Sequence, residues 1–490
     1  MASEAAHFLW EDTSFFEERY EKSASALIAV TQSLAGNPIL GQDGEEFLAL
    51  YDSMTLLPAE LFSRVWMDPT AYFWARNAYD LTKLCMANDP LPDFFKTYGA
   101  AIQRSEPKEI LAWHLQDFKK FVLGLHYLAG KDYTFATPYQ PRLPLAIPGT
   151  ELFLEGNGSV RLQGLIQGEL VVSNGSGETV RLPLKSGSAL PEGALVVGEC
   201  PVVRQSDYEL PLQLYSFNLP GFESDSEPAL SAGMAFQAKQ TGLVQEALAL
   251  IERYHPRTFA QLKQFIRLMA FKPRDAGGYG NLSYSDLPGA LICSAVSNAY
   301  EFAETLIHEF HHNRLFFVEE ISPILLNSTE ESSGNNAFYS PWRNDLRPLR
   351  GLLHALYVYT PVTQFWLNLY RSGDASDRLL EYASSQLIVM ALQLQIGAKQ
   401  LARYGEFSEM GQEVFPELQA GVEEIRAAVA ALNLPDDAPT MVCNEEGKIV
   451  HLRYRETNEP LRARDRVLVH VEECDLDHQC DELLKELSLV

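Results

Sequence analysis

The segment from His308 to His312 combines histidines and a carboxylate at a spacing that suits metal chemistry. It reads His-Glu-Phe-His-His and has the form HExxH. If this segment is helical, His308 and His312 lie one turn apart on the same face, and both imidazoles can reach one divalent metal ion. Two imidazoles are compatible with zinc, iron, nickel or copper, so the pattern by itself does not identify the metal.

The role of Glu309 depends on which metal is bound. In a zinc hydrolase this carboxylate would be the general base that deprotonates a metal-bound water. In an iron enzyme it would be an outer group or a ligand. His311, three residues after His308, is predicted to lie at the surface or behind the metal ligands.

A metal site of this kind usually has a third protein ligand, and the sequence offers candidates. Glu331 follows His312 with 18 residues between them, in a stretch that predicts a loop. His354 lies in an apolar helical segment, where a histidine without a polar partner is costly. Glu319 is two turns after His312, which is too far to bind the same ion. His354 and Glu331 therefore both stay open as the third ligand.

A basic segment follows further along the chain. Residues 339–351 place Arg343, Arg347 and Arg350 among prolines in an otherwise acidic protein. Guanidinium groups held in fixed positions suit bidentate recognition of a carboxylate. Beside a metal site that carboxylate can belong to a 2-oxo acid. The alternative is a set of surface salt bridges with the acidic body of the protein.

Together these segments resemble a known family. The stretches Leu306-Ile-His-Glu-Phe-His-His312 and Tyr339-Ser-Pro-Trp-Arg-Asn-Asp-Leu-Arg-Pro-Leu-Arg-Gly-Leu-Leu-His354 are similar to HExxH-motif proteins found beside bacterial genes for ribosomally made peptide natural products. That family is described as iron- and 2-oxoglutarate-dependent peptide β-hydroxylases. The segment Pro288–Ala295 also resembles it. The likeness covers residues 285–366, and the flanking regions match only in their helical character.

The resemblance implies specific roles for residues of this chain. His308 and His312 would bind iron(II), and the third ligand stays open between His354 and Glu331. Arg343 or Arg347 would bind the carboxylate of 2-oxoglutarate. The substrate would be a peptide that is hydroxylated at a side-chain β-carbon. The runner-up is a zinc metallopeptidase with Glu309 as base; a third possibility is a peptide-binding scaffold whose HExxH helix is only structural.

Composition limits the classes of partner. The 490 residues carry a formal net charge of −26, which argues against nucleic acid or an anionic membrane as the main partner. Six cysteines are scattered along the chain, as expected for reduced thiols. The N-terminus lacks the pattern of a signal peptide, and no run of about 18 apolar residues occurs. We therefore expect a cytoplasmic protein, whose oligomeric state the sequence does not indicate.

The elements that must position these residues are mostly helices. We expect an α+β protein with a helical region at 1–137, a β-rich section at 138–225, a helical catalytic core at 226–432 and a small mixed section at 433–490. A buried strand at 291–296 should lead into the HExxH helix, in which Phe302, Leu306, Phe310 and Phe317 face the core. Residues 259–271 are predicted to be helical, and 449–454 and 466–471 to be strands.

Overall fold

The computed structural model describes most of the chain between residues 14 and 473. The ranges outside this description are 1–13, 174–178, 184–187, 190–195, 198–201, 206–211, 214–232, 273–280, 329–337 and 474–490, together with shorter gaps at 36, 38–39, 142–144, 151, 156–158, 267, 282, 286, 295–297, 344, 445–447 and 455–456. The candidate ligand Glu331 and the turn Asn157-Gly158 lie outside the described residues.

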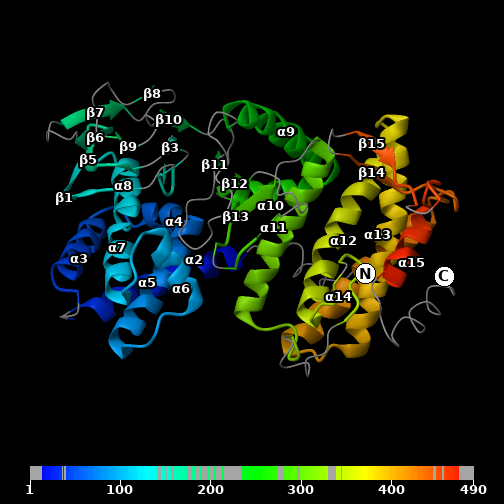
Figure 1. Ribbon diagram of the computed structural model, residues 1–490, viewed down its shortest axis with the longest axis horizontal. Coiled ribbons are helices and arrows are strands. Elements are labelled where there is room, and N and C mark those ends of the chain that lie inside the picture. The colour runs from blue at the N-terminus through cyan, green and yellow to red at the C-terminus, as the bar shows by residue number, and fades with distance from the viewer. Residues whose placement is uncertain are drawn as a thin grey trace. The chain divides into compact units, whose positions relative to one another are not determined.

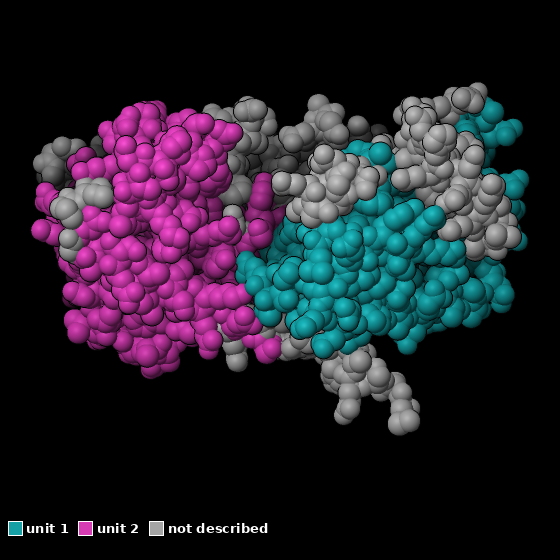
Figure 2. All heavy atoms as spheres, turned by 90° about the horizontal axis from the view of Figure 1, so that it is seen from below, with its two compact units in different colours: residues 1–13, 238–264, 296–490 teal, residues 14–237, 265–295 magenta. Residues whose placement is uncertain are grey.

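The chain divides into two compact units, coloured separately in Figure 2. Unit 1 comprises residues 1–13, 238–264 and 296–490, and unit 2 comprises residues 14–237 and 265–295. The division expected from composition follows changes of secondary structure along the chain, whereas these units follow contacts in space. The HExxH segment and the basic segment both belong to unit 1.

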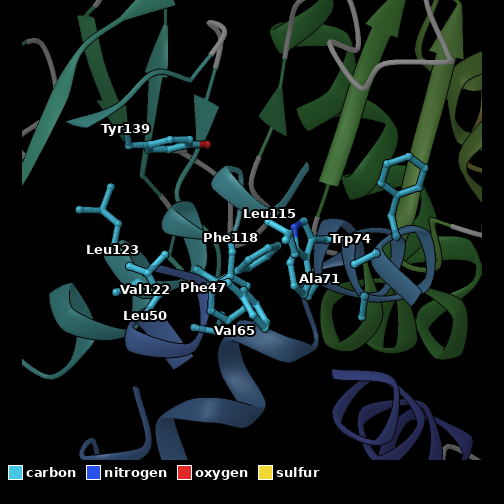
Figure 3. Close-up of a cluster of buried hydrophobic side chains, with 14 of the residues drawn as sticks. Phe47, Leu50, Val65, Ala71, Trp74, Leu115, Phe118, Val122, Leu123 and Tyr139 are labelled. Atoms are coloured by element: carbon cyan, nitrogen blue, oxygen red, sulfur yellow. The ribbon is translucent and has the colours of Figure 1, made fainter. Parts of the chain in front are cut away.

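Unit 2 begins with a group of helices around an aromatic core. The helices are α2 (Phe15–Leu34), α3 (Gln42–Thr55), α4 (Glu60–Trp66), α5 (Pro69–Ala87), α6 (Asp93–Ala101), α7 (Pro107–Gln116) and α8 (Lys119–Leu128). Phe47, Trp74 and Phe118 lie close together in this core (Figure 3). The indole N–H of Trp74 donates to the carbonyl of His114 at 2.8 Å, so its one polar atom is paired. Helical structure in this part of the chain confirms the sequence prediction.

The β-rich section follows within unit 2. One antiparallel sheet has the order β1-β5-β6-β7 and a second has the order β2-β3-β10-β8. Their strands, with the paired β4 and β9, are β1 (Tyr133–Tyr139), β2 (Leu145–Ala146), β3 (Leu152–Glu155), β4 (Ser159–Val160), β5 (Leu162–Ile166), β6 (Glu169–Ser173), β7 (Thr179–Pro183), β8 (Ser188–Ala189), β9 (Val196–Val197) and β10 (Val202–Gln205). These strands agree with the β character predicted for this part of the chain.

A small parallel sheet corrects one prediction. Its strands are β11 (Leu212–Gln213), β12 (Leu268–Lys272) and β13 (Ala290–Ser294), and β12 pairs with β13 over its whole length. The helix expected over residues 259–271 was therefore wrong in its second half, because α10 (Pro256–Phe265) ends before β12 begins. The buried strand expected before the HExxH helix is present as β13.

Unit 1 is built on long helices. These are α9 (Gly233–Tyr254, which begins in unit 2), α10, α11 (Ala299–Ile321), α12 (Leu349–Ser372), α13 (Asp377–Tyr404) and α14 (Glu409–Ala430). Helix α12 packs between α11 and α13, and α13 also contacts α14 (Figure 1). None of the helices that the structure describes is long and apolar enough to span a membrane.

The last part of unit 1 is mixed, as predicted, but one element differs. A short hairpin is formed by β14 (Met441–Cys443) and β15 (Ile449–His451), and α15 (Ala463–Glu473) packs on α13. The strand expected at 466–471 was wrong, because these residues belong to α15. Helix α15 buries Ala463 and Val467, four residues apart, against Val389 and Ile396 of α13. The chain as a whole is predominantly helical with small sheets, which agrees with the expected α+β class.

Candidate functional site

Helix α11 is fixed at its start and held in the core by its apolar face. Asn298 caps it, because the Asn298 side chain accepts a hydrogen bond from the backbone N–H of Glu301 at 2.8 Å. The four side chains predicted to face the core are fully or almost fully buried: Phe302, Leu306, Phe310 and Phe317. The helix therefore presents His308 and His312 in fixed positions.

His308 and His312 lie together as their spacing predicts. Their Nε2 atoms are 3.1 Å apart, and their rings meet at 75°. Burial lowers the pKa of His308 to about 4, and burial with the neighbouring histidines holds the pKa of His312 well below its ordinary value. Both imidazoles are therefore neutral at pH 7, which is the form that binds metals.

The spacing of the two Nε2 atoms fits ligands in adjacent positions on one metal ion. An ion about 2.1 Å from each nitrogen would see them at an angle of about 95°. Among the described residues no group of three or more His, Cys, Asp or Glu side chains converges on such a point. The described part of the chain thus supplies a pair of nitrogens.

A chain of hydrogen bonds lies behind His312. The Nδ1 atoms of His312 and His354 are 3.1 Å apart, and Nε2 of His354 lies 3.0 Å from Oε2 of Glu319. Arg350 donates to the same carboxylate, with 2.6 Å between Nη2 and Oε2. Burial alone would raise the pKa of Glu319, but the hydrogen bonds and charges of His354 and Arg350 outweigh it and keep the carboxyl ionised.

This chain determines which nitrogen of His312 carries the proton. An ionised Glu319 can only accept, so Nε2 of His354 carries its proton. If His354 carries only that proton, its Nδ1 accepts, and Nδ1–H of His312 donates to it. The lone pair of His312 is left on Nε2, on the side of His308. His354 therefore contacts the Nδ1 edge of His312, which is the edge away from the gap between the two Nε2 atoms.

An aromatic wall covers His308. The ring of Tyr359 on α12 meets the ring of His308 edge-on, with 4.9 Å between their centres. The ring of Trp342 stacks on the ring of Tyr359, with 5.4 Å between ring centres and 8° between planes. Burial, with the nearby carboxylates Glu304 and Glu309, raises the pKa of Tyr359, so its phenol stays protonated.

The loop that carries Trp342 is tied to α13. Gln393 donates to the carbonyl of Pro341 at 2.7 Å, and Gln400 donates to the carbonyl of Tyr339 at 2.8 Å. Gly397 lies between these glutamines on the same face of the helix. A Cβ atom on Gly397 would lie 2.6 Å from Cη2 of Trp342, so the glycine leaves the space that the indole occupies.

The arginines expected to bind a carboxylate are already close to one in the protein. Arg343 and Arg347 both contact Asp345, at 3.3 Å and 3.0 Å respectively. The side chain of Arg343 is 61% exposed. Arg350, for which the resemblance implied no role, lies in the first turn of α12 and reaches the histidine cluster through Glu319. The roles proposed for Arg343 and Arg347 stay predictions.

Two carboxylates of α11 flank the pair. Glu309 is buried, and Asn313 donates to its backbone carbonyl at 3.2 Å. Burial raises the pKa of Glu304 to about 7, although Trp366 donates to Oε2 of that carboxyl at 2.9 Å. Glu304 was missed by sequence reasoning, yet its position one turn before His308 was a usable signal.

His311 is buried and does not lie at the surface, which was one of the two positions predicted for it. Its Nδ1 atom lies 2.7 Å from the carbonyl oxygen of Ile307.

Comparison with known proteins identifies no family for this chain. No protein-family model matches the chain, and no curated protein matches it. The resemblance carried by the HExxH and basic segments therefore stays a prediction, and the functional argument depends on the geometry described above.

Proposed function

We propose that the protein is an iron(II)- and 2-oxoglutarate-dependent oxygenase that hydroxylates a side-chain β-carbon of a peptide, with His308 and His312 as metal ligands. The observation that carries the proposal is the pair of neutral Nε2 atoms 3.1 Å apart, one of which has its tautomer set by the chain from His354 to Glu319. Partners that orient a ligand histidine in this way are a common feature of metal sites.

The chain's own residues have separate tasks in this proposal. His308 and His312 hold the metal, and His354 with Glu319 orients His312. Tyr359 and Trp342 form an apolar wall that keeps water from one side of the site. Iron with 2-oxoglutarate would supply the oxidising power, which protein side chains lack. Two protein nitrogens leave positions for a 2-oxo acid, for dioxygen and for a further ligand.

The test is a mass measurement on a candidate peptide. Protein loaded with iron(II) under nitrogen receives 2-oxoglutarate, oxygen and the peptide, and the products are read by mass spectrometry. We expect a peptide heavier by one oxygen atom and an equal amount of succinate. The matched variant His308→Ala should give neither. Peptide cleavage that requires zinc and no 2-oxoglutarate would overturn the proposal.

A zinc metallopeptidase is the alternative, and the buried carboxylate of Glu309 next to His308 in the chain favours it. A base of that kind contributes a large factor to hydrolysis. Glu309→Gln should therefore abolish turnover in a peptidase. In the oxygenase we expect the variant to keep part of its activity, because hydroxylation needs no base to activate a water molecule.

A further inference from the structure

A cavity lies beside α11 and is separate from the histidine pair. It has a volume of about 200 Å³ and lies within unit 1, between the corner that joins α9 to α10 and the helices α11, α12 and α14. A cavity of about 150 Å³ in a protein core is large enough to bind benzene, so this one has room for a molecule of that size with polar substituents. None of the described side chains that line it belongs to the histidine pair or to the wall of Tyr359 and Trp342.

Hydrogen bonds between helices hold the walls of this cavity. The side chain of Asn368 on α12 donates to the carbonyl of Tyr254 at 2.7 Å, which fixes the last residue of α9. Arg314 on α11 donates to Oε1 of Gln261 on α10 at 3.2 Å. The walls therefore stay in place, and a ligand would bind with little ordering of side chains.

A glycine keeps one side of the cavity open. Gly421 lies inside α14, where glycine lowers helix stability relative to alanine. It lines the cavity, and a Cβ atom added to it would have no neighbour nearer than Cγ2 of Thr360 at 3.8 Å. Close packing therefore does not require a glycine at this position, whereas a ligand that occupies the space beside α14 would.

The interior of the cavity offers polar groups to a ligand. Nδ1 of His255 is buried and has no hydrogen-bond partner, which is costly in a folded protein. Burial lowers the pKa of His255 to about 4, so at pH 7 its neutral ring offers one donor and one acceptor. Thr258 and Thr360 are also buried in the lining and add hydroxyl groups. A hydrocarbon ligand would leave His255 unpaired, so these walls favour a ligand with polar atoms.

The exposed edge of the cavity carries opposite charges. Arg257 and Glu424 both line the cavity and are both exposed. Glu424 forms no salt bridge with a described residue, whereas its neighbour Glu423 pairs with Arg426 at 2.9 Å. A guanidinium has five N–H donors, so Arg257 can bind a carboxylate and keep another contact. A ligand that has both a carboxylate and an ammonium group matches the two charges.

We propose that this cavity binds a free α-amino acid. The carboxylate of the ligand contacts Arg257, its ammonium group contacts Glu424, and its side chain extends towards His255. The inference does not depend on the proposed function, because the cavity and the histidine pair share no residue. They are connected through α11, which places His311 in the cavity wall one residue before His312.

The alternative is a packing gap filled by water. Water can pair with Nδ1 of His255, and it needs no charged groups at the edge of the cavity. A side chain that fills such a gap would change stability without any effect on ligands. Binding measurements therefore separate the two interpretations.

The experiment screens the standard free L-amino acids against the metal-free full chain by thermal unfolding, followed by isothermal titration calorimetry. We expect at least one of them to raise the unfolding temperature and to bind. Its analogue without the amino group and its carboxamide should each bind about fivefold more weakly, because each lacks one ion pair at an exposed edge. If no amino acid binds, the cavity holds only water and the proposal is overturned. Equal affinity for both analogues would also overturn it.

Four variants locate the bound amino acid. Gly421→Leu fills the cavity and should remove binding, whereas Gly421→Ala adds a methyl group in ordinary contact and should bind as the wild type does. Glu424→Gln should raise the dissociation constant about fivefold, and Glu423→Gln is the matched control with unchanged affinity. The glutamine variants decide the matter if Gly421→Leu folds poorly. Wild-type affinity in Gly421→Leu or in Glu424→Gln would contradict binding in this cavity.

Discussion

His354 lies behind His312, with 3.1 Å between their Nδ1 atoms, on the side away from His308. The two rings are nearly parallel, at 27°, and come from neighbouring helices. In this position His354 acts on the candidate metal site through His312. The relationship can be tested, because a variant of His354 can remove the acceptor for Nδ1–H of His312 while the imidazole of His312 itself is retained.

Replacing His354 should weaken metal binding without abolishing it. His354→Phe leaves Nδ1–H of His312 without an acceptor, and loss of such a partner typically costs about 10- to 100-fold in metal affinity. His354→Gln keeps an oxygen that can accept this hydrogen bond and should recover most of the affinity. The measurement is competition for zinc with a chelator of known strength. Complete loss of metal in both variants would instead make His354 a direct ligand.

The histidine pair should decide whether the protein holds metal. His308→Ala and His312→Ala each remove one of the two nitrogens that lie 3.1 Å apart, so purified protein should contain less than a tenth of the wild-type metal. His311→Gln is the control, because its amide still donates to the carbonyl of Ile307. Metal content is measured by plasma mass spectrometry. Equal loss in the control would point to misfolding of α11.

Gly397 should be intolerant of a side chain, unlike another helical glycine in the same unit. Gly397→Ala would put Cβ 2.6 Å from the indole of Trp342, and overpacking of this kind costs about 1–3 kcal/mol. Gly421→Ala has no atom nearer than 3.8 Å to its Cβ and should stabilise α14 by about 1 kcal/mol. Urea unfolding of both variants gives the comparison. Equal effects would contradict close packing of Trp342 on α13.

Two matched substitutions should separate a paired indole from an unpaired one. Trp366→Phe removes the donor to the buried carboxyl of Glu304, whereas Trp342→Phe removes an N–H that has no partner. Both lose similar volume, so the difference in the free energy of unfolding should reflect the hydrogen bond. We expect Trp366→Phe to be more destabilising by about 1–3 kcal/mol. The reverse order in urea unfolding would contradict the pairing.

Stability should fall in acid because His114 is buried as a neutral residue. Its Nδ1 accepts from Tyr98 and its Nε2 donates to the carbonyl of Trp74. Burial lowers the pKa of His114 to about 4, so between pH 6.5 and 4 the unfolded chain binds more protons than the folded one. This contribution to stability is present above pH 6.5 and is lost as the pH falls towards 4.

The size of that effect can be measured with a variant that does not titrate. A pKa difference from about 6.5 to about 4 corresponds to roughly 1–2 kcal/mol lost between pH 7 and pH 5. In His114→Gln, the amide can keep both hydrogen bonds, and the same pH change should cost less by that amount. Urea unfolding at the two pH values is the measurement. Parallel losses in variant and wild type would assign the acid sensitivity to other groups.

The sequence predicted the long helices well. It failed where contacts with distant parts of the chain determine the local secondary structure. The HExxH helix and the helical region after residue 375 have strong periodicity and were correctly assigned. Residues 268–272 contain good helix formers, yet pairing with β13 makes them a strand. Residues 466–471 alternate like a strand, yet α15 forms because Ala463 and Val467 pack on α13. Tertiary contacts outweighed local preference in both cases.

The candidate site shows the same limit. The spacing of His308 and His312 was enough to predict that they share a face, because a helix fixes that relationship locally. The link from Glu319 to His354 joins residues 35 apart on two helices, and no local pattern encodes it. Glu319 was predicted to be too distant to be a ligand, and its role as a partner of His354 needed the packing of α11 on α12.

The contact between Tyr339 and His470 also sets an order of events during synthesis. The two residues are 131 positions apart, which a ribosome covers in roughly 7 to 26 seconds. Until α15 has been translated, the loop with Trp342 lacks this tie. The histidine pair on α11 therefore emerges well before the residue that ties this loop in place. If the proposed metal site forms, its two histidines are therefore made before the loop beside them is fully tied down.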